Sequence, residues 1–148
     1  MISKRLKSYF DDYRACHKTR GNQVTHAIGI PLIVLSILGL LSEIDLGWGI
    51  AGTPFRFDGG VALFGGAGLF YLWLDWRRAL PFGLVLMGTY FLGRAVPPPW
   101  LWGLFVFGWV LQGIGHYYYE KRSPAFFRNL THLLIGPFWI FCKRFDWD

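Results

Sequence analysis

The sequence contains a run of twenty residues without a charged side chain, from Asn22 to Leu41 (NQVTHAIGIPLIVLSILGLL). At about 1.5 Å per residue, a helix of this length spans the roughly 30 Å hydrocarbon layer of a bilayer. Charged residues make up only 16% of the chain, whereas roughly 25% is usual for a soluble domain. The run therefore predicts a transmembrane helix, and the composition is typical of an integral membrane protein.

Three further apolar stretches follow, namely Gly60 to Leu74, Ala79 to Gly93, and Trp100 to Tyr119. The residues from Ser42 to Gly60 are typical of a loop. We expect Asp75, between the second and third spans, to neutralise the neighbouring Arg77 and Arg78. Three prolines precede the last span, and Pro99 suits a first helical turn. The pattern predicts an all-α, polytopic membrane protein with four transmembrane helices in one domain, residues 1–148.

Two local features add expectations about packing. The glycines at positions 65, 66 and 68 would allow a neighbouring helix to approach the second span closely. The last apolar stretch, Leu130 to Phe141, is short for a crossing and contains Pro137. We expect this stretch to be interfacial or re-entrant. No small-residue cleavage site follows the first span, so we expect an uncleaved anchor.

The distribution of basic residues predicts the orientation, because cytoplasmic loops are enriched in Lys and Arg. Only Arg56 and Arg94 lie on one side of the predicted spans, and the other thirteen of the 15 basic residues lie on the opposite side. Those thirteen are Lys4, Arg5, Lys7, Arg14, Lys18, Arg20, Arg77, Arg78, Lys121, Arg122, Arg128, Lys143 and Arg144. Both termini are therefore predicted to be cytoplasmic, at a bacterial inner membrane or an endoplasmic reticulum membrane.

The composition also argues against two classes of function. The net charge of +6 accompanies eight Trp and fourteen Phe, so it indicates membrane topology and attraction to anionic lipid rather than nucleic-acid binding. The cysteines, Cys16 and Cys142, lie near opposite ends of the chain. They provide neither a disulfide framework nor a CxxC motif.

The four histidines all fall on the predicted cytoplasmic side, at positions 17, 26, 116 and 132. Two of them, His26 and His116, lie in otherwise apolar helices, where an ionisable side chain is costly unless it has a partner. Helical spacing places Asn22 one turn from His26, and Gln112 and Glu120 one turn on either side of His116. Since neutral imidazole is the commonest metal ligand, two helices could direct imidazoles at a shared metal.

Each of these residues also has a structural interpretation. A histidine near a helix end is often an interfacial or hydrogen-bonded residue, and the segment of His17 looks exposed. Glu120 could form a salt bridge with Lys121 or Arg122 and have no further role. Asn22 and Gln112 could join helices through hydrogen bonds and have no part in a site. The three tyrosines at 117–119 suit the headgroup level better than catalysis.

Two longer strings contain three of the histidines. The first string, residues 17–31 (HKTRGNQVTHAIGIP), fits the pattern H-x4-N-x3-H-x2-G-x-P. The second, residues 112–125 (QGIGHYYYEKRSPA), fits Q-x-x-G-H-x3-E-x3-P-A. Together they resemble the membrane 2-hydroxy fatty acid dioxygenases known from fungi. The motif segments cover about 30 of the 148 residues directly, and Leu134 to Phe138 resembles a closing segment of the family.

The resemblance implies an iron(II)-dependent oxygenase that shortens 2-hydroxy long-chain fatty acids by one carbon in α-oxidation, with O2 and without 2-oxoglutarate. It implies metal ligands at His17, His26, His116 and His132. Asn22, Gln112 and Glu120 would orient the imidazoles, or Glu120 would itself be a ligand. The basic side chains expected to attract the substrate carboxylate are those of Arg20, Lys121 and Arg122.

Other functions stay open from the sequence. Histidine ligands suit zinc as well as iron, which would indicate hydrolytic or structural roles. Histidines on two helices could ligate a haem. Di-iron hydroxylases and desaturases are disfavoured because their pattern uses more histidines. A lipid-binding or structural membrane protein is the non-enzymatic alternative, and the oligomeric state is open.

Overall fold

The computed structural model describes residues 2–49, 56–127 and 129–147, and these ranges are mostly helical. The α-helices are α1 (Lys4–Cys16), α2 (Arg20–Leu41), α3 (Gly59–Ala95), α4 (Pro98–Gly113) and α5 (Thr131–Arg144). A π-helix, η1 (Ile114–Glu120), continues α4, and a 3-10 turn, η2 (Ala125–Phe127), precedes α5. The two strands are β1 (Asp45–Gly49) and β2 (Arg56–Asp58). The predicted all-α class is confirmed.

Helix α1 is amphipathic and packs against α5. Its buried side chains are Leu6, Phe10 and Tyr13, which recur at the spacing of one helical face. The ring of Phe10 lies 6.0 Å from that of Phe138 on α5, in an edge-to-face arrangement. The segment of His17 looked exposed from the sequence, and this expectation is wrong. His17 continues the buried face of α1 and is only 3% exposed.

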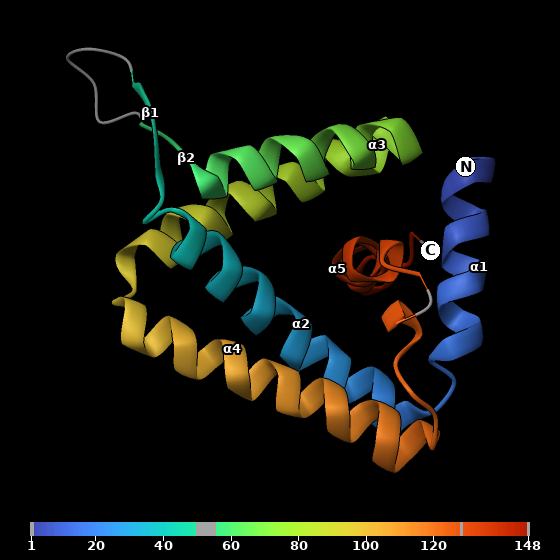
Figure 1. The fold of residues 1–148 in the computed structure, drawn as a ribbon. Coiled ribbons are helices and arrows are strands. Elements are labelled where there is room, and N and C mark those ends of the chain that lie inside the picture. The colour runs from blue at the N-terminus through green and yellow to red at the C-terminus, as the bar shows by residue number, and fades with distance from the viewer. Residues whose placement is uncertain (1, 50–55, 128, 148) are drawn as a thin grey trace.

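Helices α2 and α4 lie along each other at close range (Figure 1). The contact requires glycine, because a Cβ on Gly29 would lie 2.8 Å from the Gly108 carbonyl oxygen. A Cβ on Gly108 would in turn lie 2.7 Å from the Ile33 side chain. The glycines that the sequence favoured for close packing, at positions 65, 66 and 68, face open space instead, since nothing lies within 4 Å of where a Cβ would stand.

Helix α3 folds back on itself, so that its two arms lie side by side (Figure 1). The reversal occurs at Asp75, whose φ of −162° and ψ of 96° are not helical. The Asp75 carboxylate accepts a hydrogen bond from the Ser3 N–H at 3.0 Å and pairs with Arg78 at 2.9 Å. Arg77 instead lies over the Trp76 ring. The predicted break between the second and third apolar stretches therefore corresponds to a reversal within α3.

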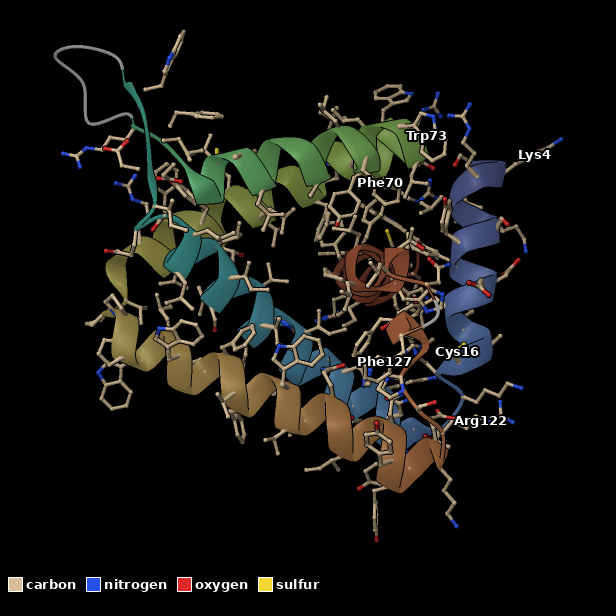
Figure 2. The ribbon with its side chains drawn as sticks, viewed as in Figure 1. Lys4, Cys16, Phe70, Trp73, Arg122 and Phe127 are labelled. Atoms are coloured by element: carbon tan, nitrogen blue, oxygen red, sulfur yellow. The ribbon has the colours of Figure 1, made fainter. Side chains whose placement is uncertain are left out.

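The N-terminal end of α1 lies beside this reversal. Arg5 donates a hydrogen bond to the Trp73 carbonyl at 3.0 Å, and its guanidinium lies 4.7 Å from the centre of the Trp73 ring. Figure 2 shows Trp73 and Phe70 on the same arm of α3. These contacts fix α1 against α3 at one end, while its other end leads to His17.

The segment predicted as a loop between the first two spans is partly a hairpin. β1 pairs with β2 in antiparallel fashion. Residues 50–55, which follow β1 in the sequence, lie outside the described residues, as does Arg128, one of the thirteen basic residues counted for the orientation. Asp58 ends the hairpin, caps α3 through the Val61 N–H at 2.9 Å, and accepts a hydrogen bond from the Tyr90 hydroxyl at 2.6 Å.

The C-terminal apolar stretch forms α5, which continues through Pro137. Ile135 and Phe138 are fully buried, and Phe138 packs on Tyr71 and Phe82 from the two arms of α3. Figure 1 shows α5 end-on between α1 and α3. The helix thus contributes to the core, and its interfacial or re-entrant position stays a prediction.

Among the described helices, α2 alone is long and apolar enough to be a candidate membrane span, with 22 residues and a mean hydropathy of 2.2. The predicted fourth span is divided into the 16 residues of α4 and the π-helix that follows. Four transmembrane helices are therefore not confirmed.

Candidate metal centre

Three histidines from three different elements meet inside the protein. His17 follows α1, His26 lies in α2, and His116 lies in η1. Their ring centres are 4.7 to 5.0 Å apart, and all three side chains are buried. One nitrogen from each ring lies within 4.8 Å of the other two, so the trio could hold a metal ion.

Backbone carbonyls orient two of these imidazoles. Nδ1 of His17 lies 2.7 Å from the Tyr13 carbonyl oxygen, and Nδ1 of His26 lies 2.9 Å from that of Asn22. A carbonyl can only accept, so Nδ1 carries the proton in both rings and Nε2 presents a lone pair. Metal-ligating histidines typically donate their other ring N–H in this way.

The contact between the Nε2 atoms of His26 and His116, at 3.1 Å, tests whether a metal would fit. Two nitrogens that each lie about 2.1 Å from one ion stand roughly 3 Å apart when they meet it at a right angle. The observed separation fits a shared cation. The donor set, which is neutral nitrogen in a buried position, suits a divalent transition metal.

Burial keeps His17 in the form that binds metals. Burial is the main cause that lowers the pKa of His17 to about 4, and the neighbouring His116 and His132 lower it further. The hydrogen bond to the Tyr13 carbonyl and the charge of Glu120 act in the opposite direction and are outweighed. The ring also stacks on Tyr13 at 3.9 Å. At neutral pH the imidazole is therefore uncharged.

The π-helix η1 determines where His116 lies. π-Helical segments are rare and occur frequently at functional sites. Lys121 ends this one in the left-handed conformation, with φ of 53°, and donates its N–H to the His116 carbonyl. Gly115 permits close contact with α2, because a Cβ there would lie 2.5 Å from Thr25 Oγ1, 2.7 Å from Asn22 Oδ1 and 2.9 Å from His26 Cε1.

We expect Gly115→Ala to separate η1 from α2. The added methyl group would cost about 1–3 kcal/mol of folding free energy, as overpacking of a core does, and would weaken metal binding by displacing His26 from His116. The matched control is Gly113→Ala, where nothing lies within 4 Å of the new Cβ. Thermal unfolding and metal titration of both variants measure the difference. Equal unfolding temperatures and equal metal affinities in the two variants would show that Gly115 is not required for the contact between η1 and α2.

The fourth histidine has a carboxylate partner. Nε2 of His132 lies 2.7 Å from a carboxylate oxygen of Asp12, while its buried Nδ1 has no hydrogen-bond partner within the described structure. His132 lies outside the trio that meets the metal criterion, yet all four histidines line one cavity. In many metal-bound histidines, one ring nitrogen donates its proton to a carboxylate and the other nitrogen binds the metal. The contacts of His132 are compatible with this arrangement.

We expect Asp12→Asn to weaken metal binding about tenfold, the low end of the range for residues that orient a ligand. The low end applies because the Asp12 side chain is 59% exposed. Asp11→Asn is the control, since Asp11 pairs with Lys7 and Arg14 and does not contact a histidine. Competition with a chelator of known affinity measures the effect. If the Asp12 variant binds metal as tightly as the control, His132 is not a metal ligand that Asp12 orients.

Asn22, Gln112 and Glu120, which we expected to orient the imidazoles, lie close to the histidines, but their contacts differ from those expected. Glu120 accepts hydrogen bonds from the Thr19 N–H at 2.7 Å and the Thr19 hydroxyl at 3.0 Å, and it is not part of the trio. Asn22 orients His26 through its backbone carbonyl and not through its side chain. Gln112 is buried and lines the cavity.

Glu120 joins η1 to the beginning of α2, where Thr19 is the N-cap. Burial tends to raise the pKa of Glu120, but the hydrogen bonds that the carboxylate accepts, of which the one from the Thr19 N–H has the largest effect, together outweigh burial and lower the net pKa. The carboxylate is therefore ionised at neutral pH, and its charge is favourable at a helix N-terminus.

The predicted carboxylate-binding residues do not line the histidine cavity. Arg20 lines a different groove, between α2 and α5. Lys121 and Arg122 are exposed where η1 ends, and Arg122 lies at the periphery in Figure 2. Among the described residues, the polar end of the cavity is formed instead by the histidines, Gln112 and Tyr13.

The cavity itself has a volume of about 360 Å³ and runs away from the histidines between α2 and the first arm of α3. Its α2 wall extends from His26 to Leu38, and its α3 wall from Tyr71 to Leu63. Twelve helical residues correspond to about 18 Å. Apart from the histidine end, the lining is almost entirely aliphatic and aromatic, as expected for a ligand pocket.

Sequence reasoning missed three residues of this site, namely Asp12, Tyr13 and Thr19. The helical spacing of Leu6, Phe10, Tyr13 and His17 could have placed Tyr13 and His17 in the interior. Nothing local marks Asp12 or Thr19, because their partners His132 and Glu120 are more than 100 residues away.

The fold and site define a class: a helical protein with a buried histidine cluster at one end of an apolar cavity. The chain matches the family described as 2-hydroxy-palmitic acid dioxygenase Mpo1-like over residues 3–145, and it belongs to this family. It is 29% identical over 140 residues to the 2-hydroxy-palmitic acid dioxygenase MPO1 of Saccharomyces cerevisiae, covering 91% of this chain and 76% of the yeast protein. No solved structure matches the chain. The resemblance inferred from the two histidine strings is confirmed.

Proposed function

We propose that this protein is an iron(II)-dependent dioxygenase that cleaves 2-hydroxy long-chain fatty acids to a product one carbon shorter. The observation that carries the proposal is the position of the buried histidine trio at one end of an elongated apolar cavity. Membership of the Mpo1-like family and the name of the yeast relative support the reaction and the substrate class.

The residues present suit iron(II). His17, His26 and His116 would hold the ion, with His132 as a fourth ligand oriented by Asp12. When bound, iron supplies open coordination positions and the redox chemistry that activates O2. Glu120 joins η1 to the beginning of α2 through Thr19, and the Asn22 backbone carbonyl orients His26, so that the imidazoles stay oriented before substrate arrives.

The cavity would place the substrate with its polar end at the histidines. The carboxylate and 2-hydroxyl would lie beside the trio and Gln112, and the acyl chain would extend toward Leu38 and Leu63. Burial of the chain excludes water from the reacting end and contributes about 0.8 kcal/mol of binding free energy per methylene. The fit favours an unbranched amphiphile with a long tail.

Haem ligation does not fit this cluster. The ring centres of His26 and His116 are 4.7 Å apart, and their Nε2 atoms are 3.1 Å apart, which leaves no space for a porphyrin between them. Zinc has similar requirements for nitrogen ligands, so the choice between zinc and iron needs a measurement.

We further propose that the chain is a multi-pass membrane protein with both termini in the cytoplasm. Support comes from α2 as a candidate span and from large apolar side chains exposed on α3 and α4, including Leu69, Leu84 and Trp100. An apolar surface of this kind is typical of contact with lipid. Labelling of single cysteines introduced at Ser3 and Trp147, in a variant whose Cys16 and Cys142 are replaced by alanine, tests the orientation of both ends in sealed vesicles.

The decisive experiment begins with anaerobic loading of detergent-purified protein with iron(II), removal of loose metal, and metal analysis. We expect about one iron per chain, and O2 consumption with 2-hydroxypalmitate but not with palmitate or 3-hydroxypalmitate. Mass spectrometry should find the shortened product with oxygen from ¹⁸O2. Tightly retained zinc with no O2 consumption, or a folded protein that binds no metal, would overturn the proposal.

A further inference from the structure

A second hollow lies beside the histidine cavity. It has a volume of about 660 Å³ and is bounded by α2, the second arm of α3 and α5. Four side chains line both spaces and separate them, namely Ile30, Val34, Leu86 and Pro137. None of the four histidines, all of which the structure describes, lines the second hollow, so it is distinct from the candidate metal centre. We refer to it as the lateral groove.

The lateral groove has a cationic end and an apolar end. Arg20, Lys143 and Arg144 lie at one end, where α2 begins and α5 finishes. Lys143 connects the two helices, because its ammonium donates to Gln23 Oε1 at 2.8 Å and lies 4.7 Å from the centre of the Trp139 ring. Lys143 is therefore held in place at this end of the groove by contacts with both helices.

The rest of the lining continues along α2 and α3 as a hydrocarbon surface. It includes Ala27 and Val34 on one side and Phe82, Val85 and Leu86 on the other. The distance from Arg20 to Val34 corresponds to fourteen helical residues, or about 21 Å. A ligand that follows this surface is long, apolar and negatively charged at one end.

The charged side chains that line the groove are all basic within the described residues. Its lining within the described residues contains no Asp or Glu. Arginine side chains bind phosphate through paired hydrogen bonds, and a lysine beside them adds a point charge. Three basic side chains at one end of the groove favour a phosphodiester, which presents several acceptor oxygens, over a single carboxylate.

The groove is also open along its side. Val24 and Val85 on its edges are 51% and 50% exposed. A ligand with two acyl chains could therefore place one chain in the groove and leave the second outside it. A closed tunnel would exclude such a ligand.

We propose that the lateral groove binds one anionic phospholipid, with its phosphate among Arg20, Lys143 and Arg144 and one acyl chain along α2 and the second arm of α3. The site does not depend on the proposed reaction, since no residue of the histidine trio lines it. It would fix the cytoplasm-facing ends of α2 and α5 to the headgroup layer of a membrane.

The test uses full-length protein in an uncharged detergent and counts bound lipid by native mass spectrometry during titration with phosphatidylglycerol or phosphatidylcholine. We expect one saturable phosphatidylglycerol per chain and no saturable phosphatidylcholine. The triple variant R20Q/K143Q/R144Q should weaken phosphatidylglycerol binding about tenfold or more, as each basic residue near anionic lipid contributes substantially. Val85→Trp should weaken it without any change of charge, by filling the apolar end.

Two controls match these variants. K4Q/K18Q/R77Q removes the same charge from residues that do not line the groove, and Leu84→Trp introduces the same indole side chain at an exposed neighbour of Val85. Loss of binding in both groove variants and retention in both controls would support the proposal.

Other outcomes would overturn it. Equal loss in the two triple variants would indicate attraction to net charge alone. Unchanged binding in Val85→Trp would place the lipid elsewhere. Competition of oleate with phosphatidylglycerol at equal concentration would assign the groove to free fatty acids. A halved particle mass in Val85→Trp would assign it to a second copy of this chain.

Discussion

Replacing His26 with alanine is expected to abolish metal binding while leaving the helices folded. His26 provides one of three converging ring nitrogens and contacts His116 directly at 3.1 Å. Residues that merely orient a ligand already contribute 10- to 100-fold to metal affinity, so loss of a ligand should cost more than about 100-fold. Metal analysis should fall from about one ion per chain to almost none.

The same loss is expected for His17→Ala and His116→Ala, because the three nitrogens act on one ion. Ser36→Ala is the control, since Ser36 is a fully buried polar residue of α2 whose hydroxyl donates to the Leu32 carbonyl within the same helix. Free imidazole added to the His26 variant should restore part of the binding by entering the space left behind. Full metal retention in any one folded variant would show that its histidine is not a ligand.

Leu63→Trp is expected to change which acyl chains the protein accepts. Leu63 lines the end of the cavity farthest from the histidines and is 38% exposed, so a larger ring can enter the cavity without displacing the core. A chain that loses three buried methylenes loses about 2.4 kcal/mol at about 0.8 kcal/mol each, which corresponds to about 50-fold in kcat/KM. Activity with short 2-hydroxy acids should be retained.

Leu69→Trp is the matched control, because Leu69 lies on the same arm of α3, is 71% exposed and does not line the cavity. The measurement is kcat/KM for 2-hydroxy acids of increasing chain length, with iron content determined in parallel. Equal losses for short and long chains at unchanged iron content would show that the acyl chain does not occupy this cavity. Failure of the proposed reaction is distinguished by the absence of O2 consumption in the wild-type protein.

The sequence predicted the helical segments, while their relation to a membrane stays a prediction. Uncharged runs and prolines are local signals, and the predicted breaks near Asp75 and Pro97–Pro99 fall where α3 reverses and α4 begins. Close packing was harder to predict. Gly29 and Gly108 allow contact between α2 and α4, whereas the glycines at 65, 66 and 68 face open space. A glycine's neighbours depend on which face meets another helix, and composition does not determine that.

The candidate site was predicted in part. His26 and His116 were favoured because an imidazole in an apolar helix needs a partner, and the structure places their Nε2 atoms in contact. His17 lies in a segment that looked exposed from the sequence, yet it completes the trio. Glu120, considered as a possible ligand, binds Thr19 instead. Each difference arises because the expected contacts were inferred within one helix and the observed ones join two.

The sequence by itself determined the helices, the positions of the histidines and the family, since these depend on residue type and spacing along the chain. Only the tertiary structure decided that His17, His26 and His116 meet, that Asp12 reaches His132 across 120 residues, and that two hollows lie on either side of one wall. The physical reason is that periodicity encodes which face of a helix is apolar. The partner of that face is selected by packing among segments that are distant in sequence.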